Sequence, residues 1–138
     1  MTEKKTSEED VRGAIALLQQ YQSRAEAHQQ QLALIELSIR ECESALNTID
    51  ELGKVKADNT ALVPIGAGAY LHATIPQVGR VLISLGAGVS AEKDSDAAKE
   101  TLAKRREEFG KMHEHLNEEL RRMYNDMQKI QLKIAQHR

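Results

Sequence analysis

One glycine motif in the sequence has the spacing of a nucleotide-binding site. Residues Gly86-Ala-Gly88-Val-Ser-Ala91 match G-x-G-x-x-A, whose glycines let the backbone approach a pyrophosphate at the start of a helix. A dinucleotide fold needs a second parallel strand after that helix, ending in an acidic residue. Because only helix-like sequence follows residue 94, we favour a hairpin turn. A dinucleotide-binding enzyme is the weaker alternative, and a cofactor titration would test it.

Histidine and cysteine side chains are the other candidates for chemistry. His113 and His115 lie two residues apart on a predicted helix and therefore point to different faces, so we expect solvated surface rather than a metal pair. His28 falls on an apolar helix stripe, where a polar residue more often sets the register. Cys42 is the single cysteine and is predicted to be a small core residue. We predict no catalytic residue, no metal site and no cofactor, and hence no enzyme.

The composition predicts long helices in a cytoplasmic protein. Of the 138 residues, 29% are charged and 3% aromatic, too few aromatic side chains for an ordinary globular core. A net charge of −2 provides no basic field for nucleic acid or an anionic membrane surface. One cysteine allows no internal disulfide, which fits a reducing compartment. Residues 1–10 lack the apolar run of a signal peptide, and residues 61–75 are too short and interrupted to span a bilayer.

Helix-breaking residues are concentrated in the middle of the chain. Six of the eight glycines and both prolines lie between positions 53 and 88. We therefore predict one domain of three segments, with helical arms at 7–52 and 94–138 around a β-rich segment at 53–93.

The first arm has the apolar repeat of a coiled coil. It is predicted to begin at Ser7 with a capping sequence and to end at Gly53 with a left-handed cap. Six consecutive heptads alternate spacings of three and four residues. The expected seam positions are Val11, Ala14, Leu18, Tyr21, Ala25, His28, Leu32, Ile35, Ile39, Cys42, Leu46 and Ile49.

The second arm has a similar repeat with one irregularity. Asp94-Ser-Asp96 supplies good N-cap residues. Two successive steps of four residues, through Leu116, predict a stutter that locally unwinds the supercoil. The expected seam positions are Leu102, Arg105, Phe109, Met112, Leu116, Leu120, Met123, Met127, Ile130, Ile134 and His137. Matched arm lengths around a compact connector favour antiparallel pairing of the two helices.

The middle segment is predicted to form two β-hairpins. Strands at 60–65 and 69–75 flank Gly66-Ala-Gly68, and strands at 80–85 and 89–93 flank Gly86-Ala-Gly88. Isolated hairpins are marginally stable and leave unpaired edges, so this charge-poor segment is expected to assemble with identical or related subunits. The expected assembly residues are Leu62, Val63, Ile65, Tyr70, Leu71, Ile75, Val81, Leu82, Ile83, Leu85 and Val89.

This arrangement resembles the alpha class of prefoldin. The resemblance covers nearly the whole chain and is most specific at Leu62-Val-Pro-Ile-Gly-Ala-Gly-Ala-Tyr70 and Val81-Leu-Ile-Ser-Leu-Gly-Ala-Gly88. Val89-Ser90 stands where eukaryotic members often have an aromatic pair, so the archaeal type is the closer match. The resemblance implies an α+β fold whose hairpins join an oligomeric β-barrel in a hexamer of two alpha and four beta subunits. It also implies capture of unfolded proteins by the coiled-coil tips, without nucleotide, and delivery to a group II chaperonin.

The open ends of the paired arms are the candidate client-binding surface. Apolar residues there exceed what a seam needs, and methionine is flexible enough to meet many partners. Ordinary coiled-coil packing is the alternative explanation. The candidates are Val11, Ile15, Leu17, Leu18, Tyr21, Met123, Tyr124, Met127, Ile130, Leu132 and Ile134.

The sequence thus predicts an ATP-independent holdase subunit. The main alternative is a structural coiled-coil scaffold with the same seams and no chaperone activity. Suppression of the aggregation of unrelated unfolded proteins would separate the two.

Overall fold

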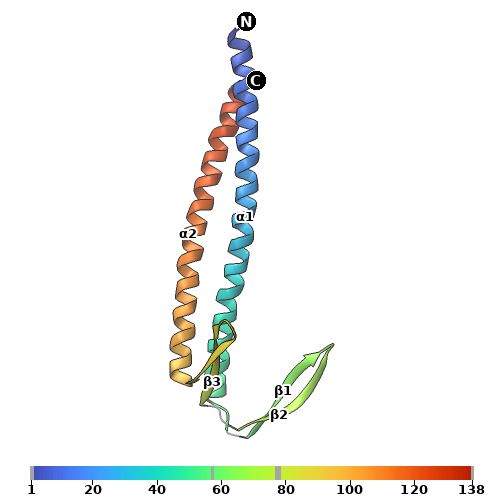
Figure 1. The fold of residues 1–138 in the computed structure, drawn as a ribbon, viewed down its shortest axis with the longest axis vertical. Coiled ribbons are helices and arrows are strands. Elements are labelled where there is room, and N and C mark those ends of the chain that lie inside the picture. Colours follow the sequence, from blue (N-terminus) through green and yellow to red (C-terminus); the bar gives the residue numbers. More distant parts are fainter. Residues whose placement is uncertain (1, 57, 77–78, 138) are drawn as a thin grey trace. The chain divides into compact units, whose positions relative to one another are not determined.

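The computed structural model describes residues 2–56, 58–76 and 79–137, with side chains described from Glu8 onward. In chain order these residues form α1 (Thr2–Leu52), β1 (Asn59–Gly66), β2 (Ala69–Ile75), β3 (Arg80–Gly86), β4 (Val89–Asp94) and α2 (Ser95–Gln136) (Figure 1). Two long helices with two antiparallel hairpins between them confirm the predicted α+β class.

The chain divides into two compact units. The first, here called the arm unit, consists of the chain up to Ser38 together with the chain from Phe109 onward. The second, here called the hairpin unit, is Ile39–Glu108 and contains both hairpins. Neither helix, over the residues described, has an apolar stretch that could cross a membrane.

In the arm unit α1 and α2 pack against each other in antiparallel order. The Tyr21 hydroxyl donates to Asp126 at 3.3 Å, His28 lies 2.9 Å from Glu119, and Glu36 lies 3.0 Å from His113, so rising numbers on α1 meet falling numbers on α2. The core of the unit is a cluster of buried seam side chains. Its members are Ala25, Leu32, Leu120 and Met123, with Tyr21 and Leu116 packed against them.

The predicted α1 seam is confirmed position by position. Each of its twelve members, from Val11 to Ile49, is buried or half-buried, whereas most residues between them are exposed. A heptad stripe of apolar side chains therefore determines which face of α1 is covered.

The α2 seam differs from the prediction at two positions. Met112 is 51% exposed, and the adjacent His113 is half-buried and contacts Glu36 on α1 instead. His137 is exposed as well. The two successive four-residue steps of the stutter therefore run from Arg105 through Phe109 to His113, earlier in α2 than predicted. Phase drift between a 3.6-residue helix and a 3.5-residue repeat must be absorbed by such a step, and local packing decides where it occurs.

The helix ends test three capping predictions. Asp94 is confirmed as the N-cap of α2, because its Oδ1 accepts from the Ala97 amide at 2.7 Å. Ser7 is not a cap, since α1 already begins at Thr2. Gly53 follows the last residue of α1 as predicted but lacks a left-handed φ, and its amide donates to the Ile49 carbonyl at 3.1 Å. Hydrogen bonds from the amides of Lys54 and Val55 to carbonyls three residues earlier finish the turn.

The two hairpins share one construction. Strands β1 and β2 pair from Asn59↔Ile75 to Gly66↔Ala69, and β3 and β4 pair from Arg80↔Asp94 to Gly86↔Val89. Both registers shift just before the glycine that precedes the turn. The predicted strands are thus confirmed to within one residue at each end.

Each hairpin closes through a two-residue turn with positive φ at both positions. The φ values are 52° and 76° at Ala67 and Gly68, and again 52° and 76° at Ala87 and Gly88. Positive φ at both central residues is the signature of a type I′ turn, which matches the twist of paired strands. Alanine is a poor residue for the first position, because its Cβ clashes in the left-handed region.

We expect Ala87→Asn to stabilise the second hairpin and Gly88→Ala to destabilise it, each by about 1 kcal/mol. A Cβ at position 88 meets no atom within 4 Å, so its penalty is purely conformational. Amide hydrogen exchange of β3 and β4 measures both effects. Slower exchange in Gly88→Ala than in the unmodified chain would contradict this account.

The hairpin unit has a small core where β3 meets both helices. Ile49 of α1, Ile83 of β3 and Ala98 of α2 are buried, with Val81 and Leu102 packed against them. Lys99 of α2 also forms an ion pair with Asp50 of α1. One face of the second hairpin is therefore covered by the chain's own helices.

Candidate functional site

The hairpins carry an uncovered apolar surface. Strands β1 and β2 contain no aspartate, glutamate, lysine or arginine. Eight of the predicted assembly residues have side chains 45% to 70% exposed. They are Leu62, Val63, Ile65, Tyr70, Leu71, Leu82, Leu85 and Val89. Large apolar surface of this kind marks a site of interaction rather than ordinary solvent-facing structure.

Three predicted assembly residues instead contribute to packing within the chain. Ile83 is 4% exposed in the core of the hairpin unit, while Ile75 and Val81 are half-buried. Val63 occupies the position in the first hairpin that Ile83 occupies in the second, yet it is 45% exposed. The first hairpin thus presents an apolar face whose counterpart in the second hairpin is covered.

Both hairpins also have unpaired backbone edges. Each forms a two-stranded sheet in the described part of the chain, so every strand has one edge without a neighbouring strand. Arg105 blocks part of one edge, because its Nη2 donates to the Ser84 carbonyl at 2.6 Å. Unpaired edges of apolar strands are templates for pairing with another chain.

An open groove of about 680 Å³ runs beside β3 in the hairpin unit. It lies between that strand and the last turns of α1, with two α2 side chains at its border. Among its lining residues are Ala45, Thr48, Ile49, Leu52, Val81, Ser84, Leu102 and Arg105. Apolar side chains line much of this groove, and the hydrogen bond from Arg105 to Ser84 lies at its border.

The open end of the arm unit carries the other predicted surface. Four of the client-binding candidates are exposed beyond the seam: Ile15, Leu17, Tyr124 and Leu132. Six are half-buried seam positions or neighbours of them, namely Val11, Leu18, Tyr21, Met127, Ile130 and Ile134. Met123 is buried in the core cluster. The exposed apolar surface is therefore smaller than the candidate set.

Both tyrosines of the candidate tip set form hydrogen bonds between the helices. The Tyr21 hydroxyl donates to Asp126 Oδ2, and the Gln29 side-chain amide donates to the Tyr124 hydroxyl. These contacts fix the rings along the arm. Ile15, Leu17 and Leu132 are the exposed aliphatic candidates.

A second apolar groove, in the arm unit, was missed by sequence reasoning. It encloses about 430 Å³ and is lined by Gln31, Leu34, Ile35, Met112, His115 and Leu116. Leu34 and Leu37 are exposed, as is Met112. The available signal was that both leucines lie off the heptad stripe, where a helix surface is ordinarily polar.

The glycine motif, the histidines and the cysteine considered for chemistry all have structural roles. Gly86 precedes the β3–β4 turn and Gly88 lies within it. No parallel strand accompanies them in the described residues, so the dinucleotide interpretation is wrong. His113 contacts Glu36 on α1 and His115 contacts Glu119 on its own helix, as expected for side chains on different faces. Over the stretches that the structure describes, no group of three histidine, cysteine, aspartate or glutamate side chains is placed to hold a metal ion. Cys42 is buried, as predicted.

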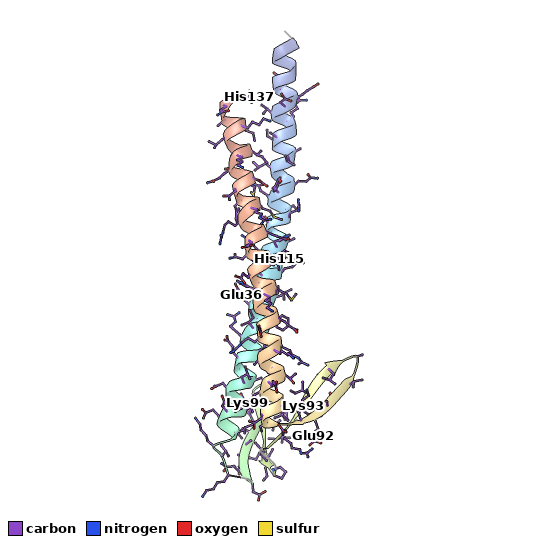
Figure 2. All side chains as sticks on the ribbon, turned by 90° about the vertical axis from the view of Figure 1, so that its left-hand side faces the viewer. Glu36, Glu92, Lys93, Lys99, His115 and His137 are labelled. Atoms are coloured by element: carbon purple, nitrogen blue, oxygen red, sulfur yellow. The ribbon has the colours of Figure 1, made fainter. Side chains whose placement is uncertain are left out.

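Among the residues whose side chains the structure describes, two ionisable groups have clearly shifted pKa values, and both lie where α1 meets α2. A hydrogen bond with Asp50 raises the pKa of Lys99. A hydrogen bond from His28 lowers the pKa of Glu119, with further help from His115. Each shift stabilises the charged form of a group that links the helices (Figure 2 labels Lys99 and His115).

Comparison with known proteins identifies the family. The family model described as Prefoldin subunit matches residues 21–137, a range that includes both hairpins and most of both helices. The chain belongs to the prefoldin family. The resemblance expected from the glycine turns and arms is thereby confirmed.

Curated relatives place the chain among alpha subunits. It is 42% identical over 112 residues to prefoldin subunit alpha of Methanococcoides burtonii, covering 81% of each chain. It is 37% identical over 129 residues to prefoldin subunit alpha of Methanosarcina barkeri, covering 91% of this chain and 90% of the relative. Two hairpins predicted the alpha class, and these relatives support it.

A solved structure has the same fold. A chain of filamentous PFD from Methanocaldococcus jannaschii, solved by cryo-EM, superposes with a TM-score of 0.73 at 18% identity. The match covers 83% of this chain and 95% of that one. Family membership therefore makes this chain a prefoldin-type chaperone subunit that assembles with other prefoldin subunits, within a family of non-enzymatic proteins.

Proposed function

We propose that this prefoldin subunit captures non-native proteins at the open end of its arm and passes them to a group II chaperonin without nucleotide. The observation that carries the proposal is the exposure of Ile15, Leu17 and Leu132 beyond a seam that is already complete. Aliphatic side chains exposed to water are unfavourable, and a scaffold has no partner at the tip to cover them. An unfolded client supplies apolar segments that can cover them.

For assembly, we propose a hexamer of two alpha and four beta subunits held together through the hairpins. The exposed face of the β1–β2 hairpin supplies apolar side chains, and the groove beside β3 adds others, such as Val81 and Leu102. Strand pairing satisfies the unpaired backbone groups, while side chains such as Leu82 leave water. The resulting β-barrel would have few exposed edges.

A structural scaffold without chaperone activity is the alternative function. It shares the seams, the hairpins and the assembly, so only the tips distinguish it. Purified protein mixed with a chemically denatured test protein, with aggregation followed by light scattering, separates the two functions.

We expect the fragment 16–123 to assemble normally and to lose most of its protection against aggregation. It lacks Ile15, Tyr124 and Leu132 but keeps the core cluster from Ala25 to Met123, so the arm should still fold. Sedimentation and far-UV circular dichroism check assembly and helicity. Full protection by an assembled fragment would contradict tip capture, and no protection by the full-length chain in its assembled state would favour the scaffold.

A further inference from the structure

His28 lies on the α1 seam with a hydrogen-bond acceptor at each ring nitrogen. Its side chain is 19% exposed. Nδ1 lies 3.0 Å from the Arg24 carbonyl oxygen, and Nε2 lies 2.9 Å from Glu119 Oε2 on α2. A neutral imidazole has one N–H and one lone pair, so it can satisfy only one of these acceptors. The protonated ring donates to both.

A second histidine–glutamate pair links the same two helices, with the histidine on α2 and the glutamate on α1. His113 of α2 is half-buried, and its Nε2 lies 3.0 Å from Glu36 Oε1 of α1. It occupies the place where the sequence predicted Met112. Each helix thus provides one histidine and one glutamate to the two pairs. Ile35 and Leu116 lie between the pairs along the helices and form an apolar layer there. Figure 2 labels Glu36 and His115 in this part of the arm unit.

The glutamate facing His28 is ionised throughout the range in which histidines titrate. Hydrogen bonding from His28 lowers the pKa of Glu119, and His115 Nε2 lies 3.0 Å from its other oxygen. Further charged residues lie within one helical turn of the four paired side chains. They are Arg24, Glu26 and Arg40 on α1, and Lys111, Glu114, Glu118, Arg121 and Arg122 on α2.

We propose that His28–Glu119 and His113–Glu36 form a proton-dependent clasp, which ties α1 to α2 more firmly when the two imidazoles are protonated than when they are neutral. Charge-assisted hydrogen bonds are about twice as strong as neutral ones. Protonation also removes the acceptor–acceptor contact that a neutral His28 leaves at one nitrogen. The clasp is independent of the proposed function, because it concerns the stability of the arm and not client binding.

The sign of the pH dependence follows from the charges. Histidine is the side chain whose charge ordinarily changes between pH 5 and 8, and the lowered pKa of Glu119 favours its carboxylate form there. The clasp should therefore strengthen as the pH falls from 8 to 6. Since Glu119 has a lowered pKa, its contribution is present above the ordinary glutamate value and is lost as the pH falls below that value.

Thermal unfolding of the full chain, followed by circular dichroism at constant ionic strength, tests the clasp. We expect the midpoint to rise by about 3 °C between pH 8 and pH 6. In the His28→Gln/His113→Gln double variant this rise should fall by more than half, because only the contact between His115 and Glu119 on α2 remains. His72→Gln, which changes an exposed histidine of β2, is the matched control and should retain it.

A second variant separates the charge from the ring. Glu119→Gln keeps the His28 imidazole and removes its anionic partner, so it should reduce the rise by about half. An unmodified chain whose midpoint stays constant or falls between pH 8 and pH 6 would overturn the proposal. An unchanged rise in the double variant would overturn it equally.

Discussion

Replacing Leu85 with aspartate should dissolve the assembled protein while leaving its helices intact. Leu85 is 54% exposed at the bulge of β3, and the substitution places a carboxylate on the apolar surface that we assign to assembly. Loss of leucine burial together with desolvation of an unpaired charge should weaken association by about 3 kcal/mol or more, at least on the order of a hundredfold. Sedimentation of the chain, alone and mixed with a single-hairpin prefoldin subunit, measures the loss.

Two further variants show why Leu85 is the informative position. Leu34→Asp introduces the same charge at a similarly exposed leucine of the arm and should leave assembly unchanged. Ile83→Asp, an obvious choice from the sequence, would bury a carboxylate against Ile49 and Ala98 and so disrupt the subunit itself. If Leu85→Asp sediments as the unmodified protein does, the hairpins are not the interface.

The second large effect is expected at the tip of the arm. The triple variant Ile15→Ser/Leu17→Ser/Leu132→Ser removes the exposed aliphatic side chains and leaves every seam residue in place. Apolar burial contributes about 25 cal/mol per Å², so client affinity should fall on the order of 100-fold or more. Aggregation of a denatured test protein, titrated with the variant, measures this loss.

The matched control for the tip variant is Leu34→Ser/Leu37→Ser. It removes two exposed leucines from the same arm unit, close to its limit at Ser38. We expect it to retain protection, and raising the salt concentration moderately should leave protection by the unmodified protein unchanged, because the contact is apolar. Equal losses in the two variants would show that capture extends along the arm. Full protection by the triple variant would rule out the tip as the capture site.

Regular repeats made much of the fold predictable from the sequence. The heptad stripe from Val11 to Ile49 identified the covered face of α1, since a helix of known period brings these side chains together wherever it packs. The Gly-Ala-Gly segments identified both hairpins, because two consecutive positive φ values close a tight turn. Asp94 predicted the start of α2, because an N-cap side chain accepts a hydrogen bond from an amide only three residues further on. Each of these features depends on neighbours within a few residues.

Features that depend on distant neighbours could not be predicted. The apolar repeat favoured Met112 as the seam residue, but the structure has His113 there. His113 contacts Glu36 of the opposite helix, 77 residues away in the chain. Prediction also failed at Gly53, where continued 3₁₀-type bonding replaces a left-handed cap. Leu34 and Leu37 escaped notice because only the paired structure shows which side chains stay exposed.

By itself, then, the sequence determined the order and type of the elements, the seams, the hairpin turns and, through its resemblance, the family. The tertiary structure alone decided how side chains of one kind divide between roles. Val63 and Ile83 occupy matching places in two similar hairpins, yet Ile83 is buried and Val63 is exposed. The physical reason is that burial depends on what packs against a face. Ile49 and Ala98 cover the face of β3, whereas Val63 on β1 stays exposed, and we propose that another subunit covers it.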